Sequence, residues 1–505
     1  MDETNDVASF YDSEPRPERL IPRPEGRSKD QSIPREYEGQ QLLSQVGLRS
    51  SSEGTQSSTC LASQRTSSAG KPSTELILFS QPLQPQAPGQ SLPSFDHPLT
   101  IEELIDQGAA GSSHPSSSEE YVHNQLHSLP PIYSNTPVWP LTDPSEALLL
   151  RHFVQNLAIW LDLCDPKQHF QIDVPQRAGT CRILLNAIFA LSARHLNRIG
   201  NYDSFASNRY HQECLKFLIP MLNDTATISD ESLFAATIIL RVLEEIDMPE
   251  TESQGHLLGI QVFVGARDPY AMGGGLGEAA FWVGLRQEIY SAMMNHKSIQ
   301  LNLEHCIVDR SIKPASDYAW ANRAVVHCAD VLNCCFGEQG VLTVRWRDLS
   351  EYNEQWKKAK PSSFTPVYYR KPDREKREVF PEIWYFQACH IIGIQHHLLA
   401  QMILAIFDPK LPRVGGNRSA AVREMETQVQ CSLRELCGIG LYNRWTPPGI
   451  FTASMGIAIC GDRCSERIEQ EALLDVLIKT EKDHARPTAA IQHQMKESWG
   501  WTSKG

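Results

Sequence analysis

From residue 138 onward, apolar side chains recur at spacings of three and four. The first run has Leu149, Phe153, Leu157, Leu161 and Cys164, and Pro166 ends it. This spacing puts apolar side chains on one face of a helix. Similar runs occur at 184–196, 210–218, 233–243, 257–264, 281–293, 321–335, 383–407, 422–436, 473–477 and 488–499. We therefore predict an all-α, multi-helix domain over residues 138–501.

Proline and helix-capping residues refine the predicted element boundaries. The helix at 210–218 should stop before Pro220, because proline in a helix interior removes a hydrogen bond. Ser229 or Asp230 can cap the next helix. Only 341–344 and 364–369 favour extended structure, and Pro366 argues against a central strand in the second. The polar stretch 344–381, with Trp346 and Trp356 as anchors, predicts a surface excursion between two helical halves.

The first 137 residues differ in composition from the rest. They contain 24 Ser and no Trp, and too few grouped apolar residues to build a core. Burial there cannot offset the entropy of ordering, so we predict a disordered leader. It holds 18 Asp and Glu against 9 Lys and Arg, a net charge of −9 within the chain's −13. Bulk charge thus gives no basic footprint for nucleic-acid binding.

One leader segment has helical signals. Leu99, Thr100, Ile101, Glu103, Leu104 and Ile105 are its key residues. Thr100 and Glu103 can form a capping box, and Leu99 can pack on Leu104. Apolar side chains among carboxylates are typical of acidic segments that fold into a partner's groove. We name this segment as a candidate partner-docking helix, and a local turn in a linker is the alternative.

The sequence also bears on compartment. The N-terminus has neither a basic nor an apolar signal region, so we expect an intracellular protein. The most apolar window, 388–407, contains His390, His396 and His397, which favours a buried soluble helix over a membrane span. Thirteen cysteines without regular spacing indicate a reducing compartment and no disulfide framework.

Catalytic motifs give no support for an enzyme. G-x-S-x-G, H-E-x-x-H, the P-loop and C-x-x-C are missing from the sequence. The glycine cluster 273–277 has Glu278 where a dinucleotide fingerprint needs glycine, so we interpret it as a helix connection. His211 and Glu213 match half of a zinc-deaminase signature whose P-C-x-x-C half is missing, and a structural or exposed helical role is favoured.

Groups of cysteine, histidine and glutamate residues are candidates for metal binding or proton transfer. Cys460 and Cys464 could join Cys431 or Cys437 at a metal, but buried thiols explain this spacing better. His390 and His397 could face one ligand, although core hydrogen bonding is commoner. Glu244 and Glu245 point to different helix faces and are interpreted as surface charges. We predict no catalytic, cofactor or metal residues.

Two basic runs, 357–360 and 370–377, could serve as a nuclear-import address. Acidic residues are interleaved in the second run, which favours a solvated loop.

Several blocks occur together in a characteristic order. They are 156–166, 184–196, 210–214, 243–247, 255–259, 281–290, 380–384 and 436–439. In this order they resemble the C-terminal regulatory domain of fungal zinc binuclear-cluster transcription factors, over roughly residues 140–500. The resemblance implies a helical domain, residence in the nucleus and regulation of transcription by RNA polymerase II. Its partners would be transcription machinery or co-regulators, with a possible homo- or hetero-oligomer and no membrane.

Family members usually begin with six cysteines that bind two zinc ions and place a helix in the DNA major groove. Here Cys60 is the only cysteine before Cys164. We therefore expect no cofactor, with zinc only if a cysteine cluster lies upstream, and DNA contact either direct or through a partner. Two alternatives stay open: a DNA-free adaptor or corepressor that binds a zinc-cluster partner, and a helical enzyme or small-molecule binder around His390 and His397.

Overall fold

The computed structural model describes residues 132–222, 227–247, 263–264, 274–303, 306, 308–338 and 340–501. All of them belong to one of the two units of the chain, Pro93–Gly505. The predicted leader, with its docking helix at 99–105, lies outside the described residues, apart from 132–137.

Thirteen α-helices and one pair of short strands make up the regular structure of the described residues. The α-helices are α3 (Pro144–His152), α4 (Asp173–Ala178), α5 (Arg182–Ile199), α6 (Ala206–Leu222), α7 (Glu231–Asp247), α9 (Gly275–Asn295), α10 (Asp317–Phe336), α11 (Thr343–Ala359), α12 (Ala388–Ile406), α13 (Arg418–Tyr442), α14 (Pro448–Cys460), α15 (Arg467–His484) and α16 (Ala489–Ser498). Strands β1 (Tyr368–Arg370) and β2 (Glu382–Trp384) pair antiparallel. The predicted all-α class is confirmed.

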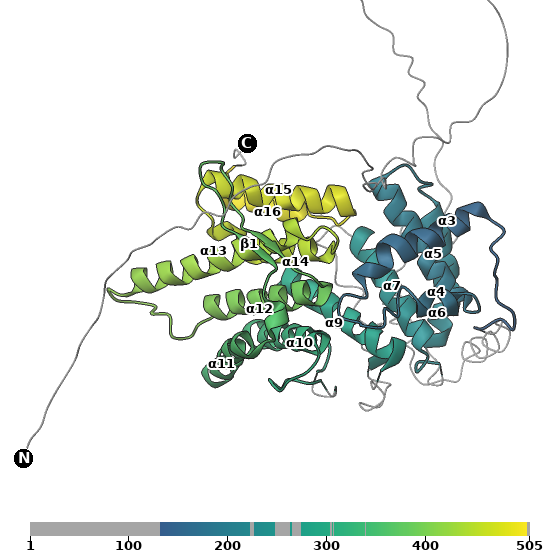
Figure 1. Cartoon of the computed structure of the whole chain (residues 1–505), viewed down its shortest axis with the longest axis horizontal. Coiled ribbons are helices and arrows are strands. Elements are labelled where there is room, and N and C mark those ends of the chain that lie inside the picture. Colours follow the sequence, from purple (N-terminus) through teal and green to yellow (C-terminus); the bar gives the residue numbers. More distant parts are fainter. Residues whose placement is uncertain are drawn as a thin grey trace, which may run out of the picture. The chain divides into compact units, whose positions relative to one another are not determined.

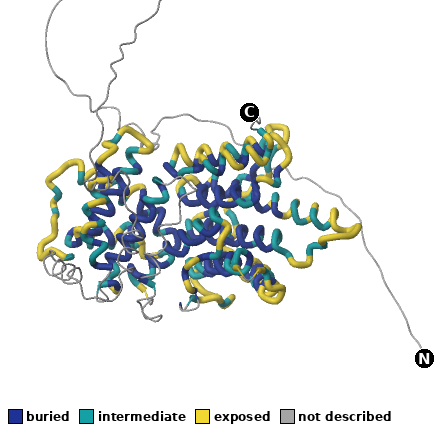
Figure 2. Tube along the Cα trace, turned by 180° about the vertical axis from the view of Figure 1, so that it is seen from behind, coloured by how far each residue is buried: buried dark blue, intermediate teal, exposed yellow. Residues whose placement is uncertain are grey.

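Helix α9 joins two groups of helices. In Figure 1, α3 to α7 form one group and α10 to α16 form the other. Contacts of α9 with α7, α10 and α14 connect the two groups. Its apolar side chains are distributed around the whole helix, as is expected for a helix buried on most sides. Figure 2 shows the buried trace running through both groups. Helix α9 is therefore packed against both groups of helices.

Helix α12 forms the centre of the second group, against α10, α11, α13 and α14. In the described part of the chain it alone is long and apolar enough to cross a membrane. However, 78% of its most apolar window is buried against the rest of the protein. Burial of this kind is typical of a core helix in a soluble domain.

The first predicted helix is not continuous. Helix α3 begins at Pro144, one residue after the cap Asp143, whose carboxylate accepts the Ser145 amide. It then widens into the π-turn η1 (Phe153–Leu157) and tightens into the 3₁₀ turn η2 (Ala158–Trp160). Phe153 and Leu157 stay buried through this change, so the apolar stripe is kept while the backbone geometry varies.

Two helix boundaries were tested by the structure. Asp230 accepts the amides of Ser232 and Leu233 at 2.8 and 3.1 Å, which confirms one of the two predicted caps of α7. The predicted stop before Pro220 is wrong, because α6 continues to Leu222. Pro220 lies in the last turn, where one hydrogen bond is lost, and burial of Met221 and Leu222 offsets that loss.

The predicted surface excursion at 344–381 is mostly exposed and is anchored by the buried Trp346 and Trp356, but its first half is helical. The extended structure predicted at 341–344 is wrong from residue 343 onward. Helix α11 begins at Thr343, and its buried residues are Trp346, Leu349, Asn353 and Trp356. These follow helical spacing on an otherwise polar helix. The second half is irregular apart from η4 (Ser362–Phe364) and β1. Helix α12 starts at Ala388, later than predicted, because residues 382–384 pair with β1.

Close backbone packing requires a glycine in α13. A Cβ atom added at Gly438 would lie 2.2 Å from the carbonyl oxygen of Pro381, which precedes β2. We expect Gly438→Ala to lower the free energy of unfolding by about 1–3 kcal/mol, because the backbone must shift to relieve the overlap. Urea denaturation followed by circular dichroism measures this loss. Gly416→Ala is the matched control, since nothing lies within 4 Å of the added atom, and equal stability of the two variants would contradict the prediction.

Candidate functional site

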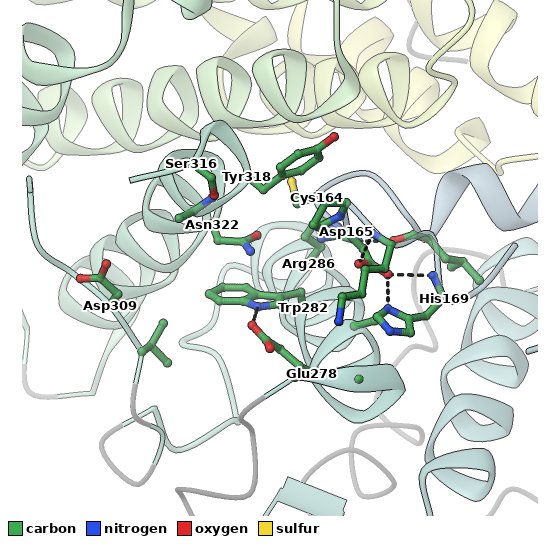
Figure 3. Close-up of a pocket in the computed structure, with 18 residues that line it drawn as sticks. Cys164, Asp165, His169, Glu278, Trp282, Arg286, Asp309, Ser316, Tyr318 and Asn322 are labelled. Atoms are coloured by element: carbon green, nitrogen blue, oxygen red, sulfur yellow. Dashed lines mark hydrogen bonds and ion pairs between the residues drawn. The ribbon is translucent and has the colours of Figure 1, made fainter. Parts of the chain in front are cut away.

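A cavity of about 360 Å³ opens beside α9 (Figure 3). Its walls come from residues 161–169, the first turns of α9, the segment 308–309 and the beginning of α10. These segments are far apart in sequence. The volume falls within the range that small-molecule sites occupy in proteins.

Helix α9 supplies one wall. Glu278, Trp282 and Arg286 are spaced by four residues, so they share one face of the helix and all line the cavity. The Arg286 Nη2 atom donates to the carbonyl oxygen of Leu161 at 2.8 Å. Its Nη1 atom is buried and has no hydrogen-bond partner among the described residues. Burial lowers the pKa of Arg286, although Cys164, Asp162 and Asp165 act in the opposite direction.

The turn opposite is fixed by two aspartates. Asp165 accepts the amides of Lys167 and His169 at 3.0 and 2.8 Å, and its carboxylate lies 2.6 Å from the His169 Nδ1 atom. Asp162 accepts the amides of Phe170 and Gln171. Burial raises the pKa of Asp162 to about 7 in spite of these bonds. The turn is thus held in one shape, and the Asp165 carboxylate is already engaged.

The remaining wall lies at the start of α10. Ser316 caps this helix by accepting the Ala319 amide at 3.3 Å. Asp309 binds the buried Arg323 guanidinium at 2.6 Å. The third acid of the cavity, Glu278, accepts only a long 3.4 Å bond from the Trp282 indole. Its carboxylate therefore has the weakest of these contacts.

Gly274 and Gly275 of the glycine cluster also line the cavity. Gly274 and Gly275 have φ values of 117° and 76°, a conformation that favours glycine. The sequence interpretation as a helix connection is correct only for part of the cluster, because α9 already begins at Gly275. The Gly277 amide donates to the Glu231 carboxylate at 3.1 Å, and Glu231 also binds Arg177 at 3.0 Å. The Glu231 carboxylate thus occupies the Gly277 amide, one of the amides at the start of α9 that would otherwise bind a phosphate.

A smaller cavity of about 90 Å³ also borders Arg286, between the two helix groups. Buried polar atoms without a partner among the described residues include Gln287 Oε1, His396 Nε2 and Arg486 Nε, and all three residues line it. The cavity is large enough for ordered water, which would satisfy such atoms. Glu245 also lines it and binds Arg486 at 2.5 Å with only 13% of its side chain exposed. Its prediction as a surface charge is therefore wrong, since α7 turns it toward the second helix group.

Residues 148–272 match the family model described as the fungal specific transcription factor domain. This segment of the chain is therefore similar to the fungal specific transcription factor domain. The match starts in α3 and takes in α4 to α7, and it ends just before the glycine cluster. It confirms the predicted family and indicates a regulator of transcription, for which the family implies a nuclear location. The chain matches no curated protein and no solved structure in the other two comparisons.

The other candidate residues, inside and outside the matched segment 148–272, have structural contacts. The His390 Nε2 atom lies 2.8 Å from Asp317, whereas His397 stacks on Trp356 with ring centroids 4.9 Å apart. The two histidines therefore contact different residues. Glu213 pairs with Arg182 and Lys216 on the surface of α6.

The candidate cysteines and the two basic runs also occupy structural or exposed positions. Cys460 and Cys464 are buried thiols, and within the described ranges no group of three or more His, Cys, Asp or Glu side chains is placed to hold a metal. Of the basic runs, the first has Lys357 and Lys358 in the last turn of α11. Arg370 is paired with Glu378 and Glu382, and the segment that follows it is mostly exposed, as predicted.

Sequence reasoning did not single out Arg286 or Trp282 as site residues, although both lie in a block that carries the family resemblance. The available signal was an arginine within the apolar stretch 276–293, a position where a charge must find a partner. The predicted docking residues Leu99 to Ile105 lie outside the described part of the chain.

Proposed function

We propose that this chain is a nuclear transcription regulator of the fungal zinc-cluster type, which controls transcription by RNA polymerase II through its helical domain. The match of residues 148–272 to the fungal specific transcription factor domain carries this proposal. In it, transcription machinery or co-regulators are the partners, and DNA is reached directly or through a partner.

The arrangement of helices suits a regulatory role. Two cavities meet at Arg286, and α9 connects both helix groups through its contacts with α7, α10 and α14. A ligand that binds one arrangement of these groups better than another shifts the equilibrium between them. Such a shift gives the domain a way to convert occupancy of the cavity into a change in partner binding.

The acidic leader completes the proposal from sequence alone. Its segment 96–107 places Leu99, Leu104 and Ile105 among carboxylates. In our proposal this segment folds onto an apolar groove of the transcription machinery, where the apolar side chains supply affinity.

A reporter assay tests this function. The full chain, fused to a heterologous DNA-binding domain, should change reporter output several-fold relative to that DNA-binding domain alone. Deletion of residues 96–107 should reduce activation, because it removes the apolar contacts. Deletion of 51–62, a Ser-rich leader segment of equal length, is the matched control and should leave output unchanged. Output equal to the DNA-binding domain alone would count against any regulatory function, and equal effects of the two deletions would exclude the docking segment.

A further inference from the structure

We propose that the cavity beside Arg286 binds a small carboxylic acid with a flat, apolar body. That this acid is the effector of the domain rests on the proposed function, whereas binding itself rests on the cavity. Three features of the described residues lead to this class of ligand. An incompletely paired guanidinium favours an anion, a surplus of acidic side chains limits the ligand to one negative charge, and an aromatic wall favours a flat, apolar body.

The guanidinium calls for an anion. Arg286 uses Nη2 on the Leu161 carbonyl, while Nη1 is buried without a hydrogen-bond partner in the described part of the chain. A buried charged donor without an acceptor is costly, and a carboxylate is the acceptor whose shape matches the guanidinium fork. The carboxylate of Asp165, which lines the same cavity, is already engaged by His169 and two amides.

The anion should carry a single negative charge. Asp165, Glu278 and Asp309 line the cavity and repel added negative charge, whereas its lysine and arginine side chains are Lys167 and Arg286. The Gly277 amide of α9 is taken by Glu231, so that helix start offers less to a phosphate. A monoanionic carboxylate is therefore favoured over a phosphate dianion.

The body of the ligand should be flat and apolar. Trp282 lies one turn before Arg286 on the same face of α9, and Tyr318 faces the same space from α10 (Figure 3). Leu161 and Val308 add apolar surface. Aromatic side chains favour planar partners at offset-stacked or edge-on geometry. The volume of about 360 Å³ suits a molecule of metabolite size.

Binding of 3-phenylpropionate to the purified full chain tests the site, with uncharged 3-phenylpropanamide as the matched probe. Calorimetry and ligand-observed NMR should detect the acid, and the amide should bind at least about tenfold more weakly, because it lacks the charge that pairs with Arg286. Arg286→Gln should weaken binding of the acid by about tenfold or more, and Trp282→Leu by several-fold. Arg347→Gln and Trp445→Leu, at exposed positions, should bind the acid like the native chain.

Equal affinity for acid and amide would overturn the proposal, as would acid binding that persists in folded Arg286→Gln. Failure of the native chain to bind the acid at 10 mM would overturn it too. Since Arg286→Gln also removes a backbone contact, the acid–amide comparison on native protein and the Trp282→Leu variant keep the test valid if that variant fails to fold. If the chain binds 3-phenylpropionate but does not change reporter output, the proposed function is contradicted and the binding site is not. If the chain changes reporter output but does not bind 3-phenylpropionate, the binding site is contradicted and the proposed function is not.

Discussion

Replacement of Glu288 by alanine is expected to lower the free energy of unfolding by about 3–5 kcal/mol. Its carboxylate lies 2.7 Å from Arg241 Nη1, and the two side chains are only 1% and 7% exposed. The pair connects α9 to α7, and the second oxygen of Glu288 accepts the Gln300 amide at 3.3 Å. Removal of the acid leaves the buried guanidinium with Glu245, whose Oε1 atom is 4.0 Å from the Arg241 Nε atom and does not replace the lost hydrogen bond. This loss costs far more than the pair itself contributes. Urea denaturation at neutral pH measures the loss.

An exposed pair provides the matched control. Arg467 and Glu471 are also 2.7 Å apart, but their side chains are 61% and 57% exposed. Water screens their charges, so Glu471→Ala should cost only about 0–1 kcal/mol. The double change Arg241→Met with Glu288→Leu should recover much of the lost stability, because no buried charge is then left unpaired. Similar losses for Glu288→Ala and Glu471→Ala would show that burial does not determine the cost.

Helical spacing predicted most of the fold, because each correctly predicted helix presents an apolar face to a core. Helix α5 is an example, with Leu184, Ile188 and Leu191 buried on successive turns. Three helices were missed. Helix α4 is only six residues long, and α11 and α14 lacked a clear signal for opposite reasons. Helix α11 is so polar that its few buried positions are hard to recognise, and α14 is so apolar that no face stands out. Amphipathic spacing is a weak signal when few positions of a helix are apolar, and also when nearly all of them are.

Sequence patterns could not predict the cavity that forms the candidate site. Its walls join residues 161–169, 274–286 and 308–322, and only tertiary packing brings them together. Nothing in the local sequence of Arg286 shows that one nitrogen binds Leu161, 125 residues away, while another has no partner. Residue types are readable from the chain, whereas cavities and unpaired atoms depend on long-range contacts.

Acidification below about pH 6.5 is expected to destabilise this protein through its buried histidines. Burial lowers the pKa of His195 and His397 to about 3 and that of His152, His327 and His396 to about 4. An unfolded histidine titrates near about 6.5, so between these values the unfolded chain binds more protons and stability rises with pH. Each independent site contributes a slope of about 1.4 kcal/mol per pH unit in this window. The His152 Nε2 and His195 Nδ1 atoms are 3.0 Å apart, so these two rings do not titrate independently.

Asp162 opposes this trend. Its pKa is raised to about 7, so the stability it contributes is present below its unfolded pKa and is lost as pH rises through about 7. Burial also raises the pKa of Asp247 and Glu435, but these three carboxyls are fewer than the buried histidines whose pKa is lowered. We therefore expect the free energy of unfolding, measured in urea at pH 7, 6 and 5, to fall steadily on acidification.

A single substitution isolates one of these histidines. His397 stacks on Trp356, and after burial the nearby His327, Lys357 and Lys360 lower its pKa further. Phenylalanine can keep the stacking but cannot take up a proton in the unfolded chain. His397→Phe should therefore reduce the acid slope by about 1.4 kcal/mol per pH unit, whereas His493→Phe, at a side chain that is 67% exposed, should leave it unchanged. A slope in His397→Phe equal to that of the native protein would show that His397 is not held neutral by burial.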